Sequence, residues 1–189
     1  MSSKSRVLAL LSAGLASLAL GTMGVGSAFA DSKTLHVEIA DDCDPATFNA
    51  AVAPGTCVGD GDTTFAAFIA ELMATKVAED WTFDPSRATV RAGQTVVAEN
   101  QGGELHSFTC VTKFGGGVVP PLNALSGNNT PAAPCGNLSL GQALGASAVP
   151  PGGSKAFDLS KAEQASPGVF QFECLIHPWM RTTLRVRGH

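Results

Sequence analysis

The chain has 189 residues, a formal net charge of −4 and a hydrophobic share of 44%. That length suits one domain that can bury a sizeable core. The mildly acidic balance, with no basic stripe, excludes a nucleic-acid binder. The sequence also lacks a P-loop, a dinucleotide fingerprint and a serine nucleophile elbow.

The N-terminus has the pattern of a secretory signal. Two basic residues precede the apolar run 7–20, and an A-x-A cleavage site follows at residues 28–30. We therefore predict that residues 1–30 are removed, that the mature chain begins at Asp31, and that it is exported to the periplasm or the cell exterior. A membrane anchor is the alternative, but the run is shorter than the roughly 20 residues that a span needs. No later stretch is apolar for long enough, so no membrane span is expected after signal removal.

Residues 31–80 form an N-terminal extension with mixed signals. Residues 34–40 alternate polar and apolar side chains, which predicts a strand. Residues 41–62 read as a turn-rich loop that carries two cysteines. Residues 62–73 place apolar side chains every three or four positions, which predicts a helix with Asp62 as its N-cap.

Residues 81–189 carry a β pattern interrupted by one long insertion. Short strands are predicted at 87–91, 95–100, 105–111, 154–159, 169–174 and 182–187, with a turn at Ala92-Gly93. The insertion 112–153 is rich in Gly, Pro, Asn and Ala and shows no sustained periodicity, so we expect a functional or bridge-ordered loop. The pattern predicts an all-β sandwich, with residues 31–189 as one domain.

The five cysteines suit an oxidising compartment and leave one unpaired. Cys174 is the natural odd residue, because a metal would hold its thiolate. The other four allow three connectivities, of which we favour the sequence-local pairs Cys43–Cys57 and Cys110–Cys135.

A metal-binding pattern lies near the C-terminus. Cys174, His177 and Met180 follow one another with C-x-x-H-x-x-M spacing, and His106 lies upstream. Two histidines, one cysteine and a weak axial methionine are the ligands of a blue copper site, and the soft sulfur donors suit one ion that cycles between Cu(I) and Cu(II). We expect the hydroxyl or the backbone N–H of Ser107 to form a hydrogen bond across the ligand loop or to the cysteine sulfur.

Residues 81–188 resemble the cupredoxins, the small blue copper proteins of the plastocyanin and amicyanin type. The resemblance rests on the ligand spacing, which matches amicyanin, and on the segments FDP at 83–85, VRAGQTV at 90–96, EN at 99–100 and GVFQFEC at 168–174. It implies a Greek-key β-sandwich with copper held by His106, Cys174, His177 and Met180. The extension 31–80 and the long insertion have no counterpart in a minimal cupredoxin.

The predicted function is one-electron transfer through this copper. The alternative is a copper-holding or copper-delivery protein that uses the same ligands. An enzyme is not expected, because the pattern offers neither an open metal position nor an acid/base pair. Four histidines are too few for a multicopper oxidase, as the resemblance implies. Trp179 beside His177 predicts an apolar patch where a redox partner docks at the exposed edge of the histidine ring.

Overall fold

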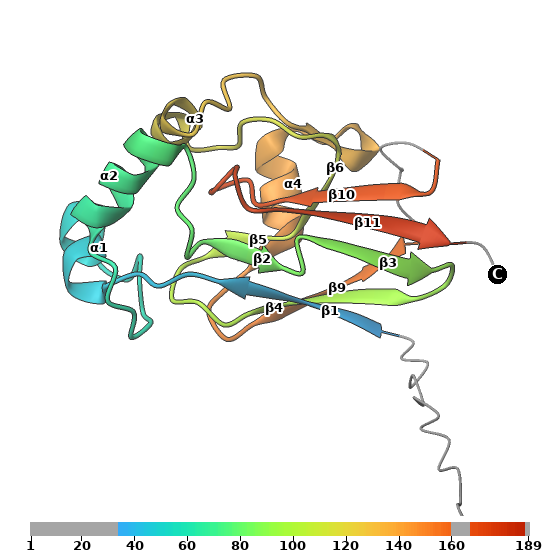
Figure 1. The fold of residues 1–189 in the computed structure, drawn as a ribbon, viewed down its shortest axis with the longest axis horizontal. Helices are drawn as coiled ribbons and strands as arrows, with labels where there is room; N and C mark the ends of the chain where they lie inside the picture. The colour runs from blue at the N-terminus through green and yellow to red at the C-terminus, as the bar shows by residue number, and fades with distance from the viewer. Residues whose placement is uncertain (1–33, 160–166, 188–189) are drawn as a thin grey trace, which may run out of the picture. The chain divides into compact units, whose positions relative to one another are not determined.

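Two β-sheets form the body of the molecule (Figure 1). The computed structural model describes residues 34–159 and 167–187; the predicted signal, residues 1–30, lies outside them. One sheet contains, in spatial order, β2 (Thr82–Asp84), β1 (Thr34–Ala40), β4 (Thr95–Asn100) and β9 (Ser154–Asp158). The other contains β3 (Arg87–Arg91), β11 (Arg181–Arg187), β10 (Val169–Glu173), β6 (Thr109–Lys113) and β7 (Ala133–Pro134). The predicted all-β sandwich is confirmed.

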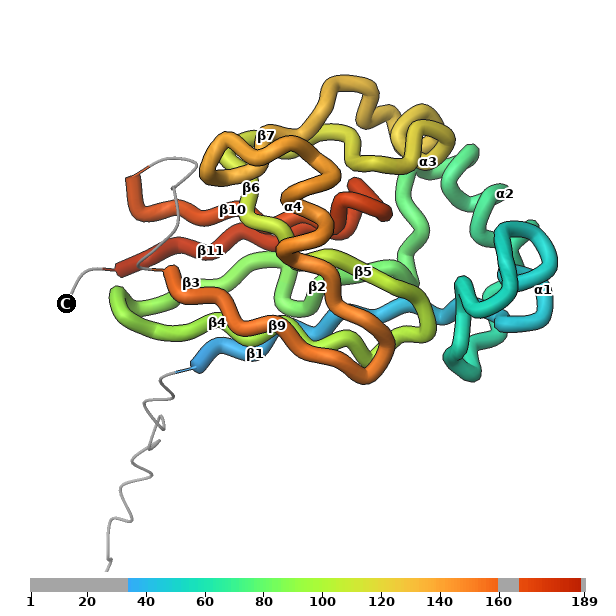
Figure 2. The backbone as a smooth tube through the Cα atoms, turned by 180° about the vertical axis from the view of Figure 1, so that it is seen from behind, coloured from blue at the N-terminus to red at the C-terminus, as the bar shows by residue number. Residues whose placement is uncertain are grey.

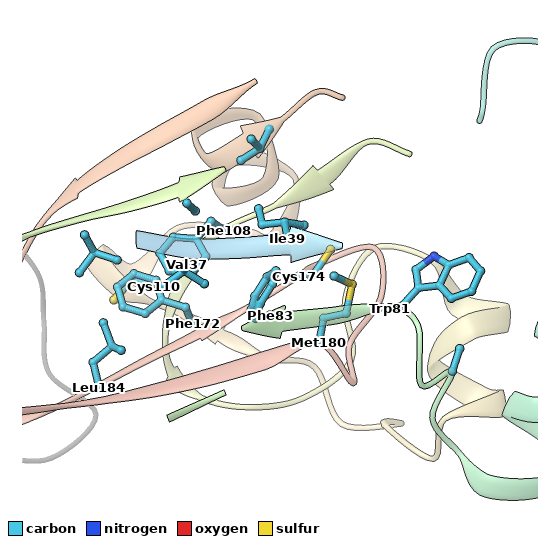
Figure 3. Close-up of a cluster of buried hydrophobic side chains, with 14 of the residues drawn as sticks. Val37, Ile39, Trp81, Phe83, Phe108, Cys110, Phe172, Cys174, Met180 and Leu184 are labelled. Carbon is cyan, nitrogen blue, oxygen red and sulfur yellow. The ribbon is translucent and has the colours of Figure 1, made fainter. Parts of the chain in front are cut away.

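The core lies between these sheets and follows the alternation of the strands. In β4 every second residue is buried, and β1 buries Val37 and Ile39. From the other sheet, Phe172 and Leu184 are buried, and Phe108 stacks on Phe172 with ring centroids 4.3 Å apart. Figure 3 shows these side chains gathered in one cluster.

The parallel pairing of β1 with β4 brings two distant segments together. Ile39 lies opposite Asn100, and the Gln101 N–H donates to the Ile39 carbonyl at 2.8 Å. Since parallel strands run in the same direction, the chain after β1 continues beside the chain after β4. Asp41 thereby reaches the segment that leads to His106.

Two helices, α1 (Pro45–Ala51) and α2 (Phe65–Thr75), lie at the end of the sandwich where β10 turns into β11 (Figures 1 and 2). The predicted helix is present, but Asp62 as its N-cap is wrong. Thr64 is the cap, because the Thr63 N–H is still bonded to the Asp42 carbonyl and holds the chain extended. α1 was not predicted; Asp44 caps it, with proline directly after the cap.

The insertion 112–153 is more ordered than the sequence predicted. It contains α3 (Pro120–Leu125), a 3₁₀ turn η1 (Cys135–Asn137), α4 (Leu140–Ser147) and β8 (Ala148–Val149) besides β7. α4 begins with a capping box between Ser139 and Gln142. This helix-start signal is present in the sequence, but the Gly/Pro-rich composition of the insertion led to the prediction of a loop. Within the two described ranges, no helix is both long and apolar enough to cross a membrane.

Both predicted disulfides are present. Cys43 is bonded to Cys57 and Cys110 to Cys135, while Cys174 is the free cysteine of the described residues. The first bridge closes the loop that carries α1, and the second ties β6 to η1 in the insertion. Buried side chains of the extension and of the sandwich belong to a single hydrophobic cluster.

Candidate metal centre

The turn between β10 and β11 presents three of the four predicted ligands. Cys174 directly follows β10, and its N–H donates to the Met180 carbonyl at 3.1 Å. The Met180 N–H in turn donates to the His177 carbonyl at 2.9 Å. These bonds close the turn, so the sequence spacing becomes a fixed arrangement of the three side chains of Cys174, His177 and Met180.

His106 comes from β5 (His106–Ser107), which pairs with β8 as a separate two-stranded ribbon. The single strand predicted over 105–111 is therefore wrong, because it is divided into β5 and β6. The Phe108 N–H donates to the Ser147 carbonyl at 2.9 Å, outside either ladder. His106 accordingly lies on a ribbon beside the two large sheets rather than in one of them.

The donor atoms of three predicted ligands converge. The Cys174 Sγ lies 3.7 Å from His106 Nδ1 and 3.8 Å from His177 Nδ1, and the two Nδ1 atoms are 3.2 Å apart. A point equidistant from the three atoms is about 2.1 Å from each, close to the roughly 2.0–2.3 Å of metal–nitrogen and metal–sulfur bonds. The set therefore fits one metal ion of copper size and softness.

The site is enclosed. His106, Cys174, His177 and Met180 are each at most 2% exposed. Met180 lies in the same buried cluster as Cys174 (Figure 3). The expectation that the His177 ring edge reaches the surface is wrong. Its ring is flanked by Phe68 of α2, with centroids 6.4 Å apart, and by Trp179, at 5.5 Å.

Ser107 forms both of the hydrogen bonds that the sequence offered as alternatives. Its N–H points at the Cys174 Sγ at 3.4 Å, and its hydroxyl accepts the Leu175 N–H at 2.8 Å. The hydroxyl also pairs with Thr109, which pairs with Ser147. A chain of buried hydroxyls thus holds the residue after the cysteine in place.

The insertion 112–153 also contacts the ligand loop, at Leu175. The Val118 N–H donates to the Leu175 carbonyl at 2.7 Å, and a Cβ at Gly117 would overlap that carbonyl. Next to the cysteine, Glu173 accepts from Arg181 at 2.9 Å and from the Gly115 N–H. Burial raises the pKa of Glu173 to about 7, although Arg181 opposes the shift.

Two carboxylates that the sequence analysis missed lie against the histidines. Asp41 Oδ2 is 2.8 Å from His106 Nε2, and Glu104 Oε2 is 3.6 Å from His177 Nε2. The indole Nε1–H of Trp81 donates to Glu104 Oε2 at 2.7 Å. Asp41 could have been placed beside His106 only by predicting that the strand 34–40 pairs in parallel with the strand 95–100. No local sequence pattern indicates that Asp41 contacts a ligand.

The electrostatics favour a negatively charged sulfur donor. Burial alone would raise the pKa of the Cys174 thiol, but hydrogen bonds with His106 and His177 outweigh it and hold that pKa well below its usual value. Burial likewise opposes charge on His106, yet Asp41 and Cys174 raise the pKa of His106 to about 9. Burial raises the pKa of Glu104, against the pull of His177.

No family model matches the chain, and no curated protein matches it. Among solved structures, a purple cupredoxin from Nitrosopumilus maritimus is 15% identical, with 80% of this chain and 98% of that one covered at a TM-score of 0.37. The oxidised plastocyanin of Dryopteris crassirhizoma is 17% identical, with coverages of 81% and 100% and a TM-score of 0.38. A Cu(I) form of an amicyanin variant is 14% identical, with coverages of 56% and 73% and a TM-score of 0.33.

Proposed function

We propose that this protein carries single electrons through one copper ion held by His106, Cys174 and His177, with Met180 as a weak axial ligand. The observation that carries the proposal is the convergence of three donor atoms within 3.8 Å of one another in a fully buried site. When bound, copper would supply a one-electron couple between Cu(I) and Cu(II).

The chain's part is to keep the donors still. Backbone hydrogen bonds from Cys174 to Met180 and from Met180 to His177 close the loop within the chain itself. The Ser107 N–H donates a hydrogen bond to the Cys174 sulfur and so stabilises its negative charge. Since these bonds do not depend on the metal's oxidation state, the ligand positions need not change when an electron arrives or leaves.

Burial favours an electron carrier over the alternative, a copper-delivery protein. A delivery site must present its ligands to an acceptor, whereas all four residues here are covered. Burial also argues against an enzyme, because a substrate would need a reachable metal position.

A chelator challenge distinguishes an electron carrier from a copper-delivery protein. We expect the reduced, copper-loaded protein to undergo repeated oxidation and reduction while a Cu(I) chelator in excess removes little metal. Rapid loss of Cu(I) with negligible redox exchange would support delivery instead.

Because the His177 ring is covered, we place the docking surface over Trp179 rather than over the histidine. Trp179 is half-buried, and its ring contacts both His177 and Phe68. Its Nε1 has no hydrogen-bond partner among the described residues, so phenylalanine there would lose no bond. We expect Trp179→Ala to keep copper and slow electron self-exchange, and Trp179→Phe to exchange at nearly the wild-type rate. Equal rates in all three proteins would remove the docking role.

We also propose export. The pattern of residues 1–30 supports it, and two disulfides suit an oxidising compartment. N-terminal sequencing of the protein recovered outside the cytoplasm should find Asp31 first. Recovery of residues 1–30 in a membrane fraction would contradict this.

A further inference from the structure

Asp41 is a buried carboxylate in the N-terminal extension, directly after β1. Its side chain is inaccessible to solvent, yet four donors surround its two oxygens. Oδ1 accepts from the Gly103 N–H at 3.0 Å and from the Cys43 N–H at 3.3 Å. Oδ2 accepts from the Glu104 N–H at 3.0 Å and lies 2.8 Å from His106 Nε2.

These contacts require an ionised aspartate. A carboxylate offers about four lone-pair sites, enough for four donors, whereas an asparagine would turn its NH₂ group toward two of the N–H groups. The fit is also tight, because a Cβ at Gly102 would overlap the Asp41 carboxylate. A group that only accepts must receive a proton from His106, so Nε2 carries a hydrogen whether the ring is neutral or protonated, and Nδ1 is the nitrogen left to bind a metal.

Nδ1 of His106 is the atom that faces Cys174 and His177. We propose that Asp41 is a positioning residue for His106. It holds the Nε2–H form of the ring so that Nδ1 points at the other donors, and its negative charge strengthens His106 as a ligand and favours the more highly charged Cu(II). The second part rests on the proposed copper function; the first does not.

The other histidine is held differently. Glu104 Oε2 is 3.6 Å from His177 Nε2, beyond hydrogen-bond range, and it accepts instead from Trp81. Among the described residues, Asp41 is therefore the one carboxylate within hydrogen-bond distance of a proposed histidine ligand. Its place in 31–80 gives that extension a direct part in the copper site, beyond covering it.

The first test needs no metal. Nitrogen-15 spectra of the imidazole rings in the metal-free protein should show a proton on His106 Nε2 that exchanges slowly with solvent. In Asp41→Asn that proton should exchange at least tenfold faster. An unprotonated Nε2 in the wild type would overturn the proposal, and so would unchanged exchange in the variant.

The second test uses the copper-loaded protein. Asp41→Asn should lower the preference for Cu(II) over Cu(I) at least tenfold, a positive shift of about 59 mV in a one-electron couple. Asp42→Asn is the matched control, because Asp42 bonds to the Thr63 hydroxyl in the same turn and is not bonded to a ligand. A potential for Asp41→Asn equal to that of wild type or of the control would refute the charge effect.

The two tests distinguish a failure of the positioning role of Asp41 from a failure of the proposed copper function. A protected Nε2–H in a protein that binds no copper would uphold the positioning and defeat the copper carrier. If Asp41→Asn does not fold, the protonation and solvent exchange of His106 in the wild type decide the proposal. A fast-exchanging proton there would then count against it.

Discussion

Ser107→Ala tests whether the buried hydroxyl chain holds the ligand loop. The Ser107 hydroxyl accepts the N–H of Leu175, a residue with no exposed surface. Removing the hydroxyl leaves that N–H buried without a partner, which costs about 1–3 kcal/mol of folding free energy. Leu175 adjoins Cys174, so we also expect the loop to shift and the cysteine–copper absorption band to move, with copper still bound.

The assay is urea denaturation of the metal-free protein, because bound copper would itself raise the apparent stability. Ser147→Ala is the control, since Ser147 lies farther along the same chain and bonds to Thr109 and to the Ala143 carbonyl. We expect it to cost about 0.5–1.5 kcal/mol and to leave the copper band in place. If Ser107→Ala costs no more than the control and leaves the spectrum unchanged, the chain does not hold the loop.

Three further changes test the fold around the site. Replacing Cys110 and Cys135 together by serine opens a loop of sequence separation 25 and should cost about 3.5 kcal/mol, measured by urea denaturation; an unchanged midpoint would contradict this. Phe68→Ala should cost about 3–5 kcal/mol and let a chelator remove copper faster, since this buried ring covers the ligand loop. The hydrogen bond from Thr47 lowers the pKa of Asp44, so the cap of α1 persists above the usual carboxyl pKa and is lost as pH falls through the lowered value. Asp44→Asn should abolish that acid-side change in the α1 amide signals, and the same titration in both proteins would refute it.

Several strands and the convergence of His106, Cys174 and His177 could be predicted because the sequence signals for them are local. Alternation marked 34–40, 87–91 and 95–100, and the structure has β1, β3 and β4 at those bounds. The turn at Ala92-Gly93 joins β3 to β4, with Gly93 at a φ of +84° that favours glycine. The metal-binding pattern from Cys174 to Met180 could be recognised because one short turn supplies three candidate ligands.

What the sequence hid depends on contacts between distant segments. The cover over His177 exists because α2 packs Phe68 against a ring more than 100 positions away. Asp41 reaches His106 only through the parallel register of β1 and β4. The seven-residue α1 is too short for a helical period to be seen, although its Asp-Pro start was present.

The visible absorption spectrum of the copper-loaded protein tests the copper site most directly. The wild type should show an intense band from the cysteine sulfur to copper, and Cys174→Ser should abolish it because the sulfur is its source. Met180→Leu should keep the band and shift the potential, as expected of a weak axial ligand. A wild type without an intense band, or a Cys174→Ser variant with the wild-type spectrum, would contradict the assignment of the site.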